Sequence, residues 1–308
     1  MDDKAIFFSA SGIAYMLGLG PAPNGQNSDF STPIKIQTDV GCTNARSVVS
    51  MPDGIMFLSD RGLYLLTRGF ELVWIGRAVQ DQLAAYPNVT SATLVAKQNQ
   101  VRFTCNNAGS TAGITLVFDY VEKQWSTFRH LQSTSGGLGV AIADACMWNG
   151  AWTFVTPAGL VYTESTATYL DNATWVFLTL ETAWITGPGS QTSPSAGPLK
   201  FQSVRSLQTH GTSYTDHDLT VQVGFDDVVA YQQSVTFPGQ SAVTAVGIEE
   251  CEVTIGTRRK CGSIRFKITD ATPTVGTVGT GRGPSFDMMG LEVGIKRGFT
   301  TNPATKKG

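Results

Sequence analysis

Three segments beyond residue 174 alternate apolar and polar residues with a period of two. The apolar positions are Leu219, Val221, Val223 and Phe225, then Ile264, Phe266 and Ile268, then Leu291, Val293 and Ile295. Successive side chains of a β-strand point to opposite faces, so the pattern predicts strands with one buried and one solvated face. Such strands are typical of antiparallel sheets, and we expect a β-sandwich-like domain over residues 174–308.

The first half of the chain contains a repeat of about fifty residues, built around a phenylalanine and a glycine five residues later. The members are Phe7 with Gly12, Phe57 with Gly62, Phe154 with Gly159 and, in a looser form, Phe103; the phenylalanines are 50, 46 and 51 residues apart. Each unit predicts a strand, a tight turn in which the glycine has a positive φ, and a second strand. Repeats of this length are typical of propeller blades, so we expect a propeller-like domain over residues 1–173.

The fold class predicted by these patterns is all-β with one short helix. The helix is expected over residues 77–86, because Val79, Leu83 and Tyr86 fall on one helical face and Pro87 follows. Three or four units are the minimum for a closed propeller. Either the ring is incomplete, or neighbouring chains complete it.

Two long stretches lack a strand pattern and are candidate interface loops. They cover residues 187–198 and 271–285, and their candidate contact residues are Gly187, Pro188, Pro194, Pro198, Gly281 and Arg282. Loops of this length in a compact domain are usually functional or disordered. We expect at least one of them to contact another chain and the tail from residue 300 to be flexible.

Composition excludes several classes of function. The net charge is −2, so no basic surface for nucleic acid is indicated, and no run approaches 18 apolar residues, so no membrane span is expected. The first residues lack the pattern of a signal peptide. The five cysteines are scattered without a C-x-x-C pair and are expected to be reduced, although Cys251 and Cys261 flank a turn and could face each other across a hairpin.

Candidates for catalytic or metal chemistry are few and weak. His210, Asp216, His217 and Asp218 could hold a metal, but the stretch around them is typical of an exposed hairpin loop. The segment 109–113 resembles a nucleophile elbow only in outline, and 276–283 lacks the Lys-Ser/Thr ending of a phosphate loop. Adjacent acids such as Asp226-Asp227, expected at a turn, and Glu249-Glu250 lie in strands or turns, and neighbours in a strand point to opposite faces, so they cannot form a glycosidase pair by themselves. We therefore expect no enzyme, no metal and no cofactor.

Five segments spread over most of the chain carry a family resemblance: Asp2–Phe8, Asp29–Pro33, Thr38–Cys42, Gly54–Tyr64 and Gly290–Gly298. Together they resemble the tail nozzle, or tail tubular protein B, class of short-tailed (podovirus) phages. The resemblance implies a propeller-bearing hub, usually a hexamer, that forms a conduit for genome ejection. The implied partners are other copies of the chain in a ring, portal- and adaptor-side tail proteins, tail fibre or spike proteins, and phage DNA in transient passage. The implied location is the virion, after assembly in the host cytoplasm.

The alternative is a glycan-binding or glycan-degrading tail spike, or a secreted enzyme on a β scaffold. Its support is the set of six tryptophans, which could stack on sugars, although most lie in apolar strands and are expected in the core. A cleft holding two carboxylates roughly 5–10 Å apart beside an exposed tryptophan would favour the enzyme.

Overall fold

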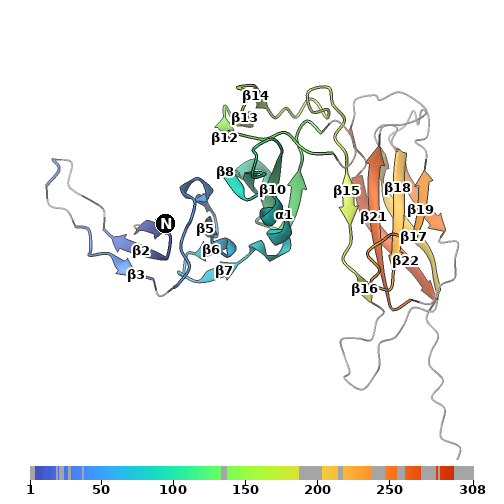
Figure 1. Ribbon diagram of the computed structural model, residues 1–308, viewed down its shortest axis with the longest axis horizontal. Helices are drawn as coiled ribbons and strands as arrows, with labels where there is room; N and C mark the ends of the chain where they lie inside the picture. Colours follow the sequence, from blue (N-terminus) through green and yellow to red (C-terminus); the bar gives the residue numbers. More distant parts are fainter. Residues whose placement is uncertain are drawn as a thin grey trace, which may run out of the picture. The chain divides into compact units, whose positions relative to one another are not determined.

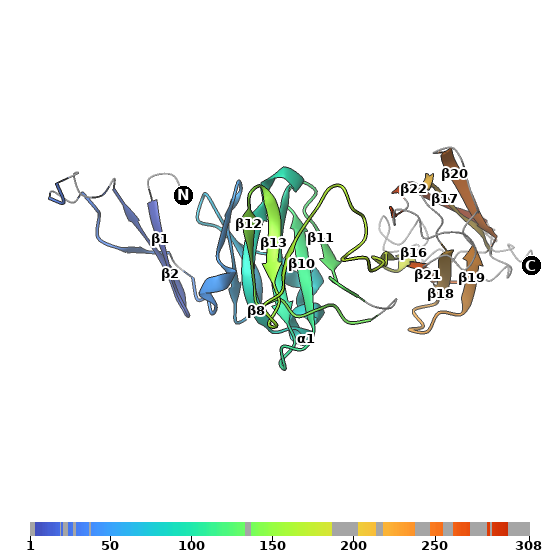
Figure 2. The same ribbon diagram turned by 90° about the horizontal axis from the view of Figure 1, so that it is seen from above.

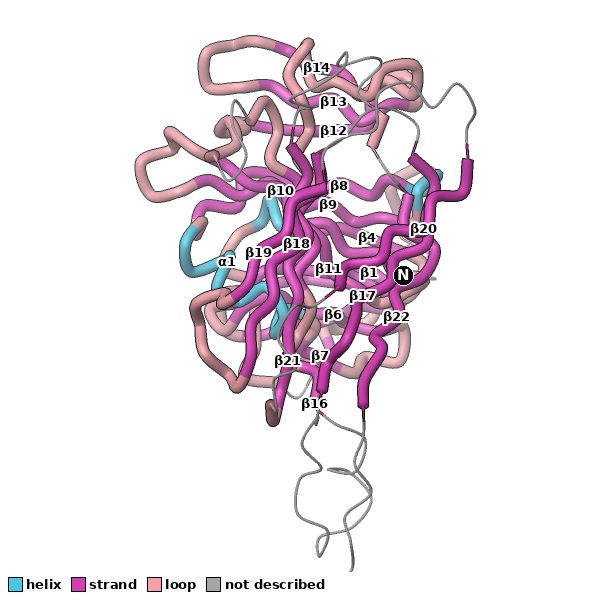
Figure 3. Tube along the Cα trace, turned by 90° about the vertical axis from the view of Figure 1, so that its right-hand side faces the viewer, coloured by secondary structure: helices cyan, strands magenta, loops and turns pink. Residues whose placement is uncertain are grey.

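A computed structural model describes residues 4–18, 20, 24–26, 29–36, 38–132, 137–186, 203–213, 218–237, 247–254, 261–271, 282–283 and 285–294 (Figure 1). In 203–213, 247–254 and 285–294 the description is of the backbone, apart from the Phe286 side chain. The described chain consists mostly of strands in antiparallel sheets, as predicted, with helix confined to short segments (Figure 3). It divides into two compact units: unit 1 is Met1–Ser133 with Gly137–Thr166, and unit 2 is Ala167–Gly308 with Thr134–Gly136.

Unit 1 contains four described antiparallel sheets, and within each one every strand pairs with the next along the chain. Sheet 1 holds β1 (Lys4–Ser9), β2 (Gly12–Leu17) and β3 (Ile34–Lys35); sheet 2 holds β4 (Val49–Met51), β5 (Gly54–Ser59), β6 (Gly62–Thr67) and β7 (Leu72–Trp74); sheet 3 holds β8 (Asn88–Val95), β9 (Gln100–Asn106), β10 (Gly113–Asp119) and β11 (Gln124–Phe128); sheet 4 holds β12 (Asp144–Trp148), β13 (Ala151–Val155) and β14 (Val161–Thr163). The four sheets are therefore successive meanders.

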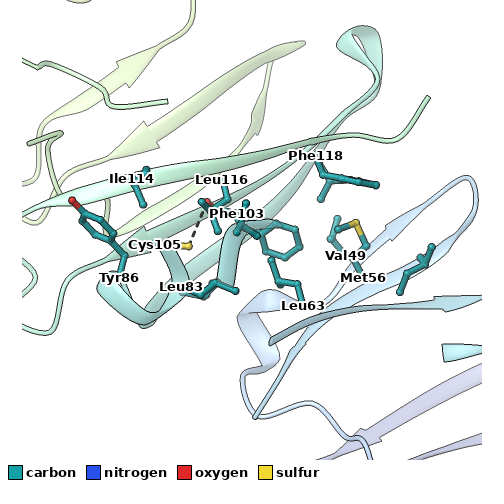
Figure 4. Close-up of a cluster of buried hydrophobic side chains, with 14 of the residues drawn as sticks. Val49, Met56, Leu63, Leu83, Tyr86, Phe103, Cys105, Ile114, Leu116 and Phe118 are labelled. Carbon is teal, nitrogen blue, oxygen red and sulfur yellow. Dashed lines mark hydrogen bonds between the residues drawn. The ribbon is translucent and has the colours of Figure 1, made fainter. Parts of the chain in front are cut away.

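Apolar clusters join each sheet to the next. Ile13 of sheet 1 packs with Phe57 and Leu66 of sheet 2. The largest cluster lies between sheets 2 and 3 and includes Met56, Leu63, Phe103, Leu116 and Phe118 (Figure 4). Val95 of sheet 3 packs with Trp152 and Phe154 of sheet 4. Sheets 2 and 3 are therefore covered on both faces.

The repeat predicted from sequence recurs as equivalent strands in four different sheets. Phe7, Phe57, Phe103 and Phe154 lie in β1, β5, β9 and β13. Ser9 pairs with Gly12 in sheet 1, and Ser59 pairs with Gly62 in sheet 2, so both hairpins have two-residue turns. Phe7 consequently has the same register in its hairpin as Phe57.

The predicted positive φ is present at two of the three repeat glycines and wrong at the third. Gly62 has φ +115° and Gly159 has φ +80°, whereas Gly12 begins β2 outside the positive-φ region. A Cβ at Gly12 would lie at an ordinary contact distance of 3.5 Å from Lys35 Cε. The turn between β1 and β2 therefore does not require a glycine at position 12.

The predicted helix is split into two types. A 3-10 helix covers Gly76–Val79, and α1 covers Gln80–Ala85; further 3-10 turns cover Ala45–Ser47 and Ala96–Gln98. Val79, Leu83 and Tyr86 are buried in the cluster between sheets 2 and 3, which confirms the predicted apolar face.

Unit 2 contains a five-stranded and a three-stranded sheet in its described part. The first holds β15 (Thr179–Glu181), β16 (Ile185–Thr186), β18 (Asp218–Phe225), β19 (Gln233–Phe237) and β21 (Ser263–Ala271); the second holds β17 (Ser203–Ser213), β20 (Gly247–Thr254) and β22 (Ser285–Gly294) (Figure 2). The alternation predicted for β18 and β21 is confirmed, because Val221, Val223, Ile264 and Phe266 are buried. Phe286 of the three-stranded sheet packs against this cluster.

The cysteine hairpin proposed from the sequence is wrong. Cys251 lies in β20, which pairs with β17, and its partner in the register is Thr209. Cys261 precedes β21, which belongs to the other sheet. The two residues therefore do not face each other across one hairpin, because the chain changes sheets between them.

Candidate functional site

Each sheet of unit 1 has a preceding face, toward the sheet before it, and a following face, toward the sheet after it. Phe57 packs toward sheet 1, Phe103 toward sheet 2 and Phe154 toward sheet 3, so all three lie on preceding faces. Their neighbours in the same strand alternate: Met56 lies on the following face of sheet 2. The repeat phenylalanine thus marks the preceding face of its sheet.

The preceding face of sheet 1 is uncovered. Phe8 of β1 contacts Phe57 of sheet 2, with ring centroids 5.0 Å apart, so the adjacent Phe7 lies on the opposite face. Phe7 is 49% exposed, whereas the exposed fractions of Phe57, Phe103 and Phe154 are 0%, 0% and 4%. Ala14 pairs directly with Phe7, and Met16 pairs with Ala5 on the same face. An apolar face is therefore presented where no described sheet precedes sheet 1.

The following face of sheet 4 is uncovered in the same way. Trp148 is 70% exposed and Val161 is 66% exposed. The register places Trp148 opposite Ala151 and Val155 opposite Val161, so these four residues share the face. Cys146 is also exposed and lies two residues before Trp148 on this side. Most of the tryptophans were expected in the core; Trp152 and Trp175 are buried, whereas Trp74 and Trp148 are exposed, Trp148 because the alternation of β12 turns it outward.

Sheet 1 also lacks a described strand before β1, whose backbone is contacted near its end by Cys42, with Cys42 N donating to the Ser9 carbonyl at 2.8 Å. In sheets 2, 3 and 4 the strand that carries the repeat phenylalanine pairs with a strand before it: β5 with β4, β9 with β8, and β13 with β12. Among the described strands, β1 pairs with β2 alone. The first strand of the repeat is therefore missing from the described part of sheet 1.

The junction between sheets 3 and 4 contains a buried charge that the sequence patterns did not reveal. The Arg102 side chain is 2% exposed and donates to Glu164 Oε2 at 3.1 Å and to Gln100 Oε1 at 3.0 Å. Its guanidinium lies over the rings of Trp152 and Phe128, at 5.0 and 5.3 Å from the centroids. Arg102 follows Val101 and precedes Phe103, and a charged residue inside such an apolar strand was the available signal.

The hydrogen bonds of Arg102 connect sheet 3 to the end of unit 1. Arg102 donates to Gln98 and Gln100, which lie at or next to its own strand, and to Glu164, which lies just beyond β14. A buried arginine that is paired and stacked fixes one packing arrangement between the sheets. It therefore ties sheet 3 to the end of unit 1.

A groove of ≈ 700 Å³ lies between sheets 2 and 3, lined by Leu65, Val73, Ile75, Arg77, Ala78, Phe118, Lys123 and Trp125. Its lining is mainly apolar and includes no carboxylate or histidine. Trp125 Nε1 donates to the Ile75 carbonyl at 2.8 Å, and Lys123 pairs with Asp53. Trp125 and Lys123 thus connect the two sheets at this groove.

The chemical candidates do not converge on a site in the described chain. His210 lies in β17 and Asp218 is buried in β18, while Asp216 and His217 lie outside the described residues. No group of three or more His, Cys, Asp or Glu side chains arranged to hold a metal occurs among the residues described. Residues 226 and 227 form a turn with φ of +56° and +59°, and the carboxylate of Asp226 accepts from Gly262 N at 2.6 Å.

The remaining glycine-rich candidates have structural roles or cannot be placed. Within 109–113, Thr111 N donates to the Asn107 side chain at 2.9 Å, which closes the turn between β9 and β10. Most of 276–283 lies outside the described residues. The part of the chain that the structure describes contains no helix long and apolar enough to cross a membrane.

The predicted interface loops fall largely outside the described residues. Gly187, Pro188, Pro194, Pro198 and Gly281 are among those not described, as is the tail from residue 300. Arg282 is described, and its guanidinium lies 5.4 Å from the centroid of the Tyr169 ring. The expectation that these loops contact another chain therefore stays a prediction.

Comparisons with known proteins were made against family models and curated proteins. No family model matches the chain, and no curated protein matches it significantly.

Proposed function

We propose that this chain is a structural subunit of a short phage tail, in the nozzle or hub ring that forms the genome-ejection conduit and carries other tail components. The observation that carries the proposal is a stack of repeated sheets with an uncovered apolar face at each end. Exposed apolar faces mark interaction sites, and repeated head-to-tail contacts generate rings when the rotation closes. The five segments that resemble tail nozzle proteins supply the kind of assembly.

In this proposal sheets 1 to 4 are blades of an open propeller arc, and unit 2 is a β-sandwich. Successive meanders with apolar clusters between them favour blades. The contact of Phe286 with the cluster of the five-stranded sheet favours two layers packed face to face. Neighbouring copies would extend the arc.

The proposed partners follow from the resemblance. They are further copies in a ring, six-fold by resemblance, together with portal- and adaptor-side tail proteins and tail fibres or spikes. Phage DNA would pass without specific contact, and the net charge of −2 suits a wall that should not hold phosphates. The subunit would be assembled in the host cytoplasm, reside in the virion, and need no cofactor.

The mass of the native assembly tests this function. We expect purified protein to form a homo-oligomer in native mass spectrometry and a ring with a central opening in electron micrographs. Antibodies against the chain should label the tails of the virions that contain it. A stable monomer at high concentration, or label absent from the tail, would exclude the proposal.

A glycan-binding or glycan-degrading protein remains the alternative, favoured by the exposed indoles of Trp74 and Trp148. Aromatic faces of this kind stack on sugar rings as readily as on protein. The purified chain should release no oligosaccharide from capsular or lipopolysaccharide glycan. Release at enzyme-like rates that one Asp or Glu substitution abolishes would favour the enzyme instead.

A further inference from the structure

We infer that the preceding face of sheet 1 in one copy packs against the following face of sheet 4 in a second copy of the chain. The inference rests on the proposed function, since it names the two surfaces through which the subunits of the assembly meet. The junctions already present within unit 1 support it.

All three junctions within unit 1 obey one rule. The following face of each sheet, for example that of sheet 2 with Met56, packs against the preceding face of the next sheet, which carries the repeat phenylalanine. The uncovered face with Phe7 is a preceding face without its partner. The uncovered face with Trp148 is a following face without its partner. The two uncovered faces are therefore of the two types that pack together in each of the three junctions, one preceding face and one following face.

The side chains on the two faces suit this contact. Sheet 1 offers the ring of Phe7 beside the small Ala14 and the flexible Met16, which adapts to an irregular partner. Sheet 4 offers the indole of Trp148 beside the small Ala151. A large ring on each face thus has a small residue beside it, as an interdigitated junction requires.

The charges on the two faces are opposite. Lys35 pairs with Ala14 and so lies on the face of Phe7. Asp144 pairs with Val155 and so lies on the outward face of sheet 4. Asp144 also lies 3.9 Å from Arg46, but both side chains are more than half exposed, so this pair is weak. Opposite charges favour the two faces over contact of either face with itself.

One chain cannot make this contact by itself in the structure described. Both faces are exposed, and sheets 2 and 3 lie between sheets 1 and 4 in the order of packing. The partner must therefore be another molecule, and the contact is head to tail rather than two-fold.

Charge substitution on each face tests the contact. We expect Phe7→Glu and Trp148→Glu each to weaken self-association about thirtyfold in sedimentation, as the loss of a central aromatic residue does at an interface. The matched control is Val121→Glu, an exposed valine in the turn between β10 and β11, which should assemble like the parent. All three variants should unfold at the parent temperature. Parent-like assembly of Phe7→Glu or Trp148→Glu would overturn the inference.

A cross-link tests the pairing of the faces without removing either aromatic ring. Ala14→Cys, placed beside Phe7, should form an intermolecular disulfide with the native Cys146 of another copy under mild oxidation. Cys146→Ser should abolish that product, and Val121→Cys should not form it with Cys146. Failure of the Ala14→Cys variant to cross-link, in a preparation that still assembles, would overturn the inference.

The results separate this inference from the proposed function. A ring that persists in Phe7→Glu and lacks the cross-link overturns the contact and leaves the structural role standing. A parent chain that stays monomeric overturns both. Assembly that needs both faces, in a chain absent from phage tails, supports the contact and overturns the tail function.

Discussion

Sheets 1 and 2 of unit 1 start from the same local pattern and end in different environments. Phe7 with Gly12 and Phe57 with Gly62 have the same spacing and the same hairpin register. Phe57 is fully buried because sheet 1 covers it, whereas Phe7 is half exposed because no described sheet covers it. A repeat therefore determines how strands pair, while burial depends on the sheet that lies beyond.

The two sheets should differ most in the free energy of unfolding that is lost when the repeat phenylalanine is replaced by alanine. Phe57→Ala should lower the free energy of unfolding by about 3–5 kcal/mol, since it leaves a cavity between sheets 1 and 2. Phe7→Ala should lower it by less than about 1 kcal/mol, since the side chain is already half solvated. Urea denaturation at a concentration where the protein is monomeric measures both. Equal losses in the two variants would contradict the comparison.

The junction between sheets 3 and 4 differs from the other two because it contains the buried charge of Arg102. Arg102→Ala should destabilise unit 1 by about 3 kcal/mol, because it removes a buried, stacked cation and leaves Glu164 without its partner. Glu164 is partly solvated, which places the loss at the lower end of the range for a broken buried pair. Arg102→Met keeps much of the packing and should cost less.

The control for this prediction is an exposed ion pair that also joins an arginine to a carboxylate. Arg61 Nη2 lies 2.7 Å from Asp39 Oδ2, and the pair holds the pKa of Asp39 below its usual value through this hydrogen bond. Arg61→Ala should leave the urea midpoint almost unchanged, because the pair is solvated. If the two alanine variants lose similar stability, burial of Arg102 is not what makes it important.

A smaller effect is expected at the repeat glycines. Gly62→Ala should cost about 1–3 kcal/mol, since φ is +115° and a Cβ would lie 2.5 Å from Gln80 Oε1. Gly12→Ala should be neutral to within about 0.5 kcal/mol, because its φ is not positive and its Cβ would meet only an ordinary contact. Thermal unfolding of the two variants measures the difference, and a larger loss for Gly12→Ala would refute it.

A further comparison concerns the reactivity of two thiols, Cys105 between sheets 2 and 3 and Cys146 on the outward face of sheet 4. Burial raises the pKa of Cys105, between sheets 2 and 3, to about 12, whereas Cys146 is exposed on sheet 4. The nucleophile is the thiolate, so at pH 8 iodoacetamide should label Cys146 rapidly and Cys105 only after unfolding. Peptide mass mapping reads both sites. Rapid labelling of Cys105 in folded protein would contradict the assigned burial.

The raised pKa of Cys105 also makes the free energy of unfolding depend on pH in the alkaline range. Below pH about 9 the Cys105 thiol is protonated in both the folded and the unfolded chain and contributes nothing. Between that pH and about 12 the unfolded chain releases this proton and the folded chain keeps it, so the free energy of unfolding falls as pH rises. Cys105→Val should show a shallower fall over this window, measured by urea midpoints.

The sequence predicted the elements whose apolar residues recur at a strand or helix period. Alternation predicted β18 and β21 with their buried residues, and helical spacing predicted the buried face of Leu83 and Tyr86. It did not predict that Cys251 and Cys261 belong to different sheets, because pairing between distant strands leaves no local signal.

The candidate surface was predictable only in part. The repeat identified Phe7, and the structure gives Phe7 the same hairpin register as Phe57. Phe7 and Trp148 are exposed because no described sheet packs against their faces. The residues next to them in the sequence do not show whether such a sheet is present. The interface loops predicted at 187–198 and 271–285 lie largely outside the described residues and stay predictions.

The order of strands in the two units has a consequence for folding during synthesis. In unit 1 each strand pairs with its neighbour in sequence, so every sheet can close within a few tens of residues of leaving the ribosome. In unit 2 paired strands lie far apart in the sequence. Thr179 of β15 pairs with Thr269, and Ser203 of β17 pairs with Gly294, so these pairs can form only after most of the unit has been synthesised. Unit 1 should therefore be native while β15 and β17 are still without partners. A nascent chain stalled before β21 would expose unpaired strands, which makes this stage of synthesis the one most prone to aggregation.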